Sequence, residues 1–157
     1  MKSFEQLVNE ALQEIPELFP WDLLKEIASN EPPLLLDIRE QDEFELAHIK
    51  GSLWVPRGFL EQACDWNYDV TLPELVTARD KHIVIICRSG TRSALAGVTM
   101  KSMGYKKVSS LKTGVRGWND FDQTLIDINN QVVDPDEAES HLENKVSNEQ
   151  LEPRLRK

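Results

Sequence analysis

The sequence predicts an α/β fold of three layers, in which a central parallel sheet is covered by helices on both faces. Two observations predict it. Short apolar runs alternate along the chain with segments of helical periodicity, as in strand–helix–strand units with parallel strands. The runs are apolar at consecutive positions, which is expected of strands that are buried on both faces. The 157 residues suffice for one domain with a substantial core.

The N-terminal half combines helices with short strands. Apolar residues recur three and four positions apart in its helical segments, and Pro16 ends the first of them. A short, mostly apolar run follows Pro32 and Pro33 and is the first expected strand. The expected elements are helices over 3–15, 21–28 and 40–47, strands over 34–38 and 52–55, and further helical candidates over 59–64 and 72–78.

The C-terminal half contains the strongest expected strand, at residues 82–86. A glycine-containing turn over 87–92 follows, then a helix over 93–103 that Gly104 ends, a strand over 107–111 and a helical turn over 114–118. The periodicity weakens after residue 121. We therefore expect three parts: a helical N-terminal extension over 1–21, one α/β domain over 22–121, and an acidic, partly helical tail over 122–157.

The composition excludes several classes of partner. The chain has 27 acids against 18 bases, a formal charge of −9, and such a surface is a poor ligand for nucleic acid or anionic lipid. No apolar run approaches the ~20 residues of a membrane span, and no secretory signal is visible. We expect a cytoplasmic protein with reduced cysteines. Its two cysteines and three histidines lack the spacing of zinc ligands, so neither a metal nor a cofactor is expected.

One stretch departs from this overall acidity. Between Lys81 and Asn119 there are eight bases and no acid. Most of these bases are interpreted as a solvated face. However, Cys87 lies within the stretch, followed by Arg88, Gly90 and Arg92. A local positive field in an acidic protein is what a site for a small anion requires.

Cys87 is the first residue after the strongest expected strand, and a helix follows the turn that it begins. Ligands of parallel sheets bind at the carboxyl ends of strands. There the N–H groups of the turn and the positive end of the helix dipole favour an anion. We therefore expect a cysteine that is present as the nucleophilic thiolate. The alternative is a small buried cysteine without a chemical role.

Five segments in order carry a resemblance to a known family. They are Leu36–Glu40 with Glu43-Phe44, His48–Ser52 with Pro56, Ile85–Ala94, Met103–Tyr105 and Gly114–Trp118. Together they resemble the rhodanese-like domains, the thiosulfate sulfurtransferases, over about residues 22–121. Ala47, Ser52 and Thr113 depart from the family pattern, where glycine, alanine and glycine are common, and none of them is the nucleophile.

The resemblance implies a rhodanese-like three-layer fold, a catalytic domain over 22–121 and a persulfide mechanism. Cys87 attacks the sulfane sulfur of a small anionic donor such as thiosulfate, and the persulfide then passes its sulfur to a thiol or to cyanide. We also keep a protein sulfur acceptor and a homodimer as candidate partners. Arg88 and Arg92 would bind the sulfonate oxygens of the donor. The expected substrate-binding residues are Arg88, Ser89, Gly90, Thr91, Arg92 and Ser93.

Four nearby residues have two interpretations each. Asp37 and Arg39 follow their own strand at the same edge as Cys87, and either line the site or form an ion pair that fixes the loops; we favour the pair. His48 is interpreted as structural rather than as a general base. Cys64 is interpreted as a buried helix cysteine, with a role in resolving the Cys87 persulfide as the alternative.

Two other functions share this kind of loop. A cysteine phosphatase or arsenate reductase needs a C-x₅-R loop, whereas Cys87 and Arg92 form C-x₄-R, a smaller cradle that suits a sulfur atom better than a phosphate. An interaction or sulfur-relay module on the same scaffold is the second alternative. The measured mass of the chain after incubation with thiosulfate discriminates among all three functions.

Overall fold

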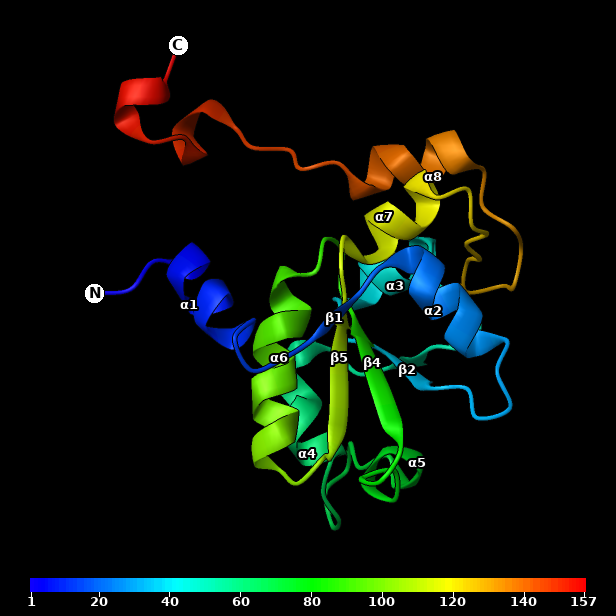
Figure 1. Ribbon diagram of the computed structural model, residues 1–157. Coiled ribbons are helices and arrows are strands. Elements are labelled where there is room, and N and C mark those ends of the chain that lie inside the picture. The colour runs from blue at the N-terminus through cyan, green and yellow to red at the C-terminus, as the bar shows by residue number, and fades with distance from the viewer.

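A five-stranded sheet, all of it parallel, forms the centre of the computed structural model, which describes residues 1–157 (Figure 1). The strand order is β1-β5-β4-β2-β3. The strands are β1 (Glu17–Leu18), β2 (Leu34–Asp37), β3 (Leu53–Trp54), β4 (His82–Ile86) and β5 (Lys107–Leu111). The predicted α/β fold with a central parallel sheet is confirmed.

Helices cover both faces of the sheet. On one face lie α4 (Leu60–Ala63), α5 (Pro73–Val76) and α6 (Thr91–Ser102), and α1 (Phe4–Ala11) packs on the outer side of α6. On the other face lie α2 (Pro20–Ile27), α7 (Gly114–Asp120) and α8 (Pro135–Leu142), with α3 (Gln41–Leu46) against α8. Short 3₁₀ turns occupy Arg57–Phe59, Asn148–Gln150 and Pro153–Leu155. None of the helices combines the length and the apolar character that crossing a membrane requires.

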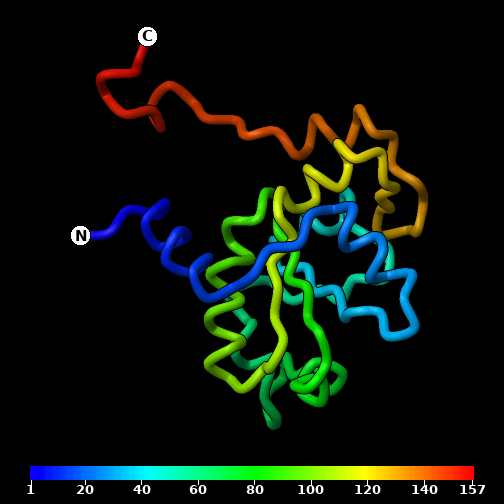
Figure 2. The backbone as a smooth tube through the Cα atoms, in the orientation of Figure 1, coloured from blue at the N-terminus to red at the C-terminus, as the bar shows by residue number.

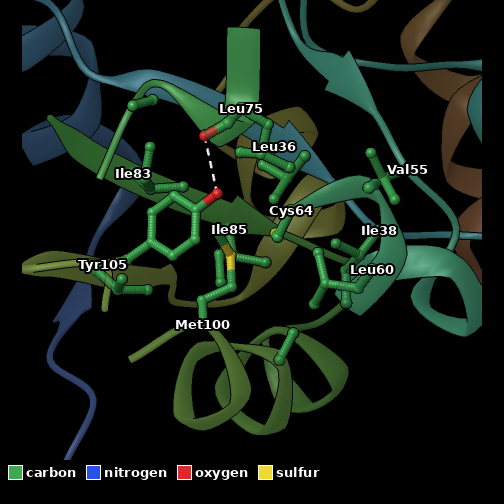
Figure 3. Packing of buried hydrophobic residues seen from close by; sticks show 14 of the residues in the cluster. Leu36, Ile38, Val55, Leu60, Cys64, Leu75, Ile83, Ile85, Met100 and Tyr105 are labelled. Carbon is green, nitrogen blue, oxygen red and sulfur yellow. Dashed lines mark hydrogen bonds between the residues drawn. The ribbon is translucent and has the colours of Figure 1, made fainter. Parts of the chain in front are cut away.

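The alternation of side chains along β4 sets the direction of the residue that follows it. Ile83 and Ile85 pack into the cluster beneath α4, α5 and α6, part of which is drawn in Figure 3. Val84 and Ile86 pack into the cluster on the opposite face. Because successive strand side chains point to opposite faces, Cys87 continues the first set and joins the α6 side of the sheet.

Strand β1 is an element that the sequence analysis did not expect. Its two residues pair with Ser110 and Leu111 of β5, and the ladder is extended by the bond from the Ser110 N–H to the Pro16 carbonyl at 2.9 Å. A strand of only two residues, between Pro16 and Pro20, shows no periodicity in the sequence, so it is recognised only by its pairing with β5. Helix α1 ends at Ala11 rather than at residue 15, because Ile15 turns inward to pack against Gly97 of α6.

The segment 122–142, expected as part of a tail, packs against the domain. Leu125, Ala138 and Leu142 are buried in the same cluster as α7. Ile126 exchanges two backbone hydrogen bonds with His48, at 2.8 and 3.0 Å. Residues 143–157, by contrast, are almost all exposed and extend away from the rest of the chain (Figures 1 and 2). The apolar residues of the segment 122–142 are few and widely spaced, so its sequence has no clear helical or strand periodicity.

Candidate active site

The turn after β4 surrounds the Cys87 sulfur with polar groups. The side chain of Cys87 is fully buried, and its Sγ accepts hydrogen bonds from the backbone N–H of Gly90 at 3.1 Å and of Ser93 at 3.4 Å. The Ser93 hydroxyl lies 3.3 Å from the same sulfur. The site lies at the centre of the sheet edge, because β4 has β5 on one side and β2 on the other. The turn thus forms a cradle for a sulfur anion, as predicted for this position.

Gly90 gives the turn its shape. Its φ of +93° lies in the left-handed region, and it caps the N-terminus of α6. A Cβ at this position would lie 3.1 Å from the Leu111 carbonyl oxygen and 3.3 Å from the Thr113 nitrogen. A larger residue would therefore strain the backbone and push the turn away from the connection between β5 and α7.

Helix α7 holds the turn from behind. The N–H groups of Val115 and Arg116 donate to the carbonyls of Cys87 and Arg88 at 2.9 and 3.0 Å. In a trans peptide the N–H points opposite to the carbonyl, so the N–H groups of Arg88 and Ser89 point away from α7. These two N–H groups, and those of Thr91 and Arg92 in the first turn of α6, donate to no protein acceptor. The loop thus offers four unpaired donors to an anion.

Ser110 is a site residue that the sequence analysis missed. Its hydroxyl is fully buried, lies 2.7 Å from the Ser93 hydroxyl and donates to the Gly90 carbonyl at 3.4 Å. The parallel pairing of β5 with β4 places Ser110 opposite Ile85, two residues before Cys87. Ser110 could have been selected from the sequence, because a serine is unusual in a strand that is expected to be buried on both faces.

Arg92 lies beside the sulfur cradle but is bound to Glu43 of α3. Its two terminal nitrogens donate to the two carboxylate oxygens at 2.9 and 2.8 Å, and about a third of each side chain is exposed. Burial alone would raise the pKa of Glu43, but the bonds from Arg92 and from the Glu40 N–H hold it below the ordinary value. The same pair raises the pKa of Arg92. The binding of a donor by Arg92 remains a prediction, and Glu43 joins the site as a residue not selected from the sequence.

The other predicted loop residues differ in exposure. Arg88 is half-buried and has no carboxylate partner, so it is the available cation of the loop. Thr91 is half-buried and Ser89 is exposed. Gly90 and Ser93 are buried and contact the sulfur through their backbone N–H groups. Of the six predicted residues, Gly90 and Ser93 thus contact the Cys87 sulfur directly, and the other four lie in the same turn or in the first turn of α6.

Asp37 and Arg39 form a closed ion pair beneath the site. Arg39 donates to both carboxylate oxygens of Asp37, at 2.8 to 3.1 Å, and to the Ala47 carbonyl at 2.7 Å. Asp37 also accepts the N–H of Arg39, and the Trp54 indole donates to the Arg39 carbonyl. Both charged side chains are essentially inaccessible to solvent. The geometry therefore matches the interpretation that we favoured, a pair that fixes the loops.

His48 and Cys64 are held by local contacts away from the cradle. The His48 ring stacks on Phe44 at 3.9 Å, and its Nδ1 lies 2.8 Å from the Phe44 carbonyl oxygen. Cys64 is a free thiol buried beside Tyr105, and burial raises its pKa. Figure 3 shows the Cys64 and Tyr105 side chains in the apolar cluster, where the Tyr105 hydroxyl donates to the Leu75 carbonyl at 2.8 Å. These contacts support a structural interpretation of both residues.

With this geometry in place, comparisons with known proteins identify the fold and the family. Residues 20–121 match the family described as "Rhodanese-like domain". A structure from Rhodopseudomonas palustris, described as a "Protein of Unknown Function" and "Possible Tyrosine Phosphatase", is 32% identical with a TM-score of 0.69, over 78% of this chain and 93% of that one. A thiosulfate sulfurtransferase from Pseudomonas aeruginosa shares the fold, with a TM-score of 0.62 and 22% identity over 92% of this chain and 24% of that one.

Two curated relatives carry names that concern sulfur. The chain is 36% identical over 110 residues to the "Putative sulfur carrier protein YrkF" of Bacillus subtilis, over 70% of this chain. It spans only 54% of the length of that relative. It is also 29% identical over 103 residues to the "Putative thiosulfate sulfurtransferase, mitochondrial" of Schizosaccharomyces pombe, over 64% of this chain and 72% of the relative.

Proposed function

Because the chain belongs to the rhodanese-like domain family, we propose that it is a sulfurtransferase that carries a sulfane sulfur as a persulfide on Cys87. The observation that carries this proposal is the cradle itself. A buried sulfur accepts two backbone N–H bonds, and four further N–H groups around it lack a protein acceptor. N–H donors that the folded backbone holds in place would stabilise an anion with little reorganisation during the reaction.

The first half-reaction charges the cysteine. The Cys87 thiolate attacks the outer sulfur of thiosulfate, a sulfur–sulfur bond to Sγ forms, and the bond to the oxidised sulfur breaks. Sulfite leaves with the electron pair of the broken bond, and the product is an anionic persulfide on Cys87. We assign the binding of that anion to the N–H groups of Arg88, Ser89, Thr91 and Arg92, because these groups donate to no protein acceptor. Arg88 is the cation available to the oxygens of the donor.

The second half-reaction discharges it. An acceptor thiolate attacks the outer sulfur of the persulfide, and the Cys87 thiolate leaves with the electron pair. The acceptor becomes a persulfide, and the enzyme returns to its starting state. The name of the Bacillus relative supports a protein thiol as acceptor, and the name of the yeast relative supports thiosulfate as donor.

The geometry supports phosphatase chemistry less well. The loop is one residue shorter than C-x₅-R, and the arginine that would flank a phosphate is bound on both terminal nitrogens by Glu43. A tetrahedral oxyanion needs this arginine at its side, so the existing ion pair would have to open first.

The test is the mass of the intact chain after incubation with thiosulfate and removal of excess donor. We expect an increase of about 32 Da, one sulfur atom, which cyanide or a thiol removes. Cys87→Ser should show no increase, whereas the matched variant Cys64→Ser should gain the sulfur as the wild type does. A wild-type chain that gains no sulfur from thiosulfate or from a persulfide contradicts the proposal.

A further inference from the structure

We propose that Glu43 is a specificity-determining residue that withholds Arg92 from the sulfur donor, so that the site favours persulfides of low charge over the thiosulfate dianion. This inference rests on the proposed function and deepens it, because it concerns which donor charges Cys87. Glu43 acts through Arg92 and is therefore a positioning residue, not a catalytic one.

The first step of the argument is the geometry of the ion pair. A guanidinium binds a sulfonate or a carboxylate best with two parallel N–H bonds. Both terminal nitrogens of Arg92 already make such bonds, at 2.9 and 2.8 Å, to the two oxygens of Glu43. Glu43 is itself fixed, because one of its oxygens also accepts the Glu40 N–H at 3.0 Å in the first turn of α3. The second arginine of the loop is therefore occupied.

The second step is the charge around the sulfur. Glu43 cancels the charge of Arg92, and Asp37 cancels that of Arg39 in the buried pair. Among Arg39, Arg88 and Arg92, Arg88 alone has no carboxylate partner. Glu43 therefore takes away one of the two loop arginines that could bind an incoming dianion.

The third step compares the two classes of donor. Charging from thiosulfate brings two negative charges to a thiolate and releases a doubly charged sulfite. Charging from a persulfide R–S–SH transfers the outer sulfur with its proton. The bond between Sγ and that sulfur forms, the R–S to sulfur bond breaks, and R–S⁻ leaves with the electron pair. The second reaction brings at most one negative charge when R is neutral. A site whose second loop arginine is already bound to a carboxylate fits the second reaction better.

The Glu43–Arg92 pair is also partly exposed to solvent, so a substrate can reach it. About 32% of the Arg92 side chain and 28% of the Glu43 side chain are exposed, whereas Asp37 and Arg39 are closed to solvent. Glu43 and Arg39 line a cavity of about 110 Å³ together with His141 and Leu142 of α8. Loss of the Glu43 charge would therefore leave Arg92 beside the cradle and accessible, not buried without a partner.

The test compares two donors, thiosulfate and 2-hydroxyethyl persulfide, by the second-order rate at which Cys87 gains sulfur. Glu43→Gln should raise the thiosulfate rate about tenfold, the value of one further charge-assisted contact to the donor. The rate with the persulfide should change less than about threefold. The gain with thiosulfate should decrease as ionic strength rises, since it comes from an exposed charge.

Two further variants separate this effect from general changes. Glu45→Gln removes the same charge from the same helix, but Glu45 bonds Gln41 and not Arg92, so both rates should stay at the wild-type values. In Glu43→Gln/Arg92→Gln the gain with thiosulfate should disappear. If Glu43→Gln folds poorly, Glu43→Asp is the replacement variant, because it keeps the negative charge. Its shorter side chain should loosen the bonds to Arg92 and therefore also raise the rate with thiosulfate.

The outcomes distinguish this inference from the proposed function. If Glu43→Gln slows both donors equally while Cys87 still gains sulfur, the pair is a scaffold and the inference is wrong, although the sulfurtransferase proposal stands. An equal increase with both donors, or an increase that survives the loss of Arg92, also overturns it. If the wild type gains sulfur from neither donor, the proposed function fails and the inference fails with it.

Discussion

Two arginine–carboxylate pairs lie at the same edge of the sheet. They have the same chemical groups but differ in solvent exposure and in the elements that they join. The Asp37–Arg39 pair is closed to solvent, and its guanidinium also bonds the Ala47 carbonyl. The Glu43–Arg92 pair is about one-third exposed and joins two elements beside the sulfur cradle. A buried pair that loses one partner leaves an uncompensated charge, whereas an exposed pair can open at little cost. The first therefore serves the fold, and the second is free to serve specificity.

The largest expected effect comes from breaking the closed pair. Arg39→Ala leaves the Asp37 carboxylate buried with no cation and should lower the free energy of unfolding by about 3–5 kcal/mol. Arg92→Ala, by contrast, should lower it by about 1 kcal/mol or less, because the Glu43 carboxylate is already partly exposed to solvent and keeps its bond from the Glu40 N–H. Urea unfolding of the two variants measures the difference. Equal losses would show that exposure does not separate the two pairs.

An intermediate effect is expected from the buried hydroxyl behind the cradle. Ser110→Ala removes the 2.7 Å contact to the Ser93 hydroxyl and should cost about 1–2 kcal/mol of unfolding free energy. It should also slow the gain of sulfur by Cys87, since Ser93 contacts the sulfur. The matched variant is Ser109→Ala, whose hydroxyl bonds His82 instead. It should lose similar stability without slowing the reaction, and a similar slowing in both variants would place Ser110 outside the site.

The smallest expected effect is the pH dependence of the open pair. The pKa of Glu43 is lower in the folded chain than in the unfolded one, so the unfolded chain binds the proton first as the pH falls. The stability due to this carboxylate is complete above its ordinary pKa of about 4.5 and is lost as the pH falls through the lower folded value. Wild type and Glu43→Gln should differ by less than about 1 kcal/mol at pH 6. Their free energies of unfolding should converge as the pH falls from the ordinary pKa of about 4.5 through the lower folded value, and a difference that stays constant would contradict the prediction.

Much of the site could be predicted because its signals are local in the chain. Cys87 follows a five-residue strand, Gly90 adopts a positive φ three residues later, and Ser93 lies in the first turn of α6. Each position depends on neighbours within six residues. The sequence did not predict the roles of Ser110 and Glu43 or the existence of β1, because their partners lie far away in the sequence. A two-residue strand or a single carboxylate also produces no periodic pattern of apolar residues.

The sequence by itself determined the alternation of strands and helices, the position of Cys87 at the end of a strand and the polar loop that follows it, since burial patterns and turn residues act over short distances. Only the tertiary structure decided which charges meet. Arg92 and Glu43 are 49 positions apart, and their pairing depends on the packing of α3 and α6 around the carboxyl edge of the sheet. Likewise, α8 covers the sheet because Ala138 and Leu142 find an apolar cluster built by other elements. Contacts between residues far apart in the sequence depend on how helices and strands pack together, and no single segment of the sequence determines that packing.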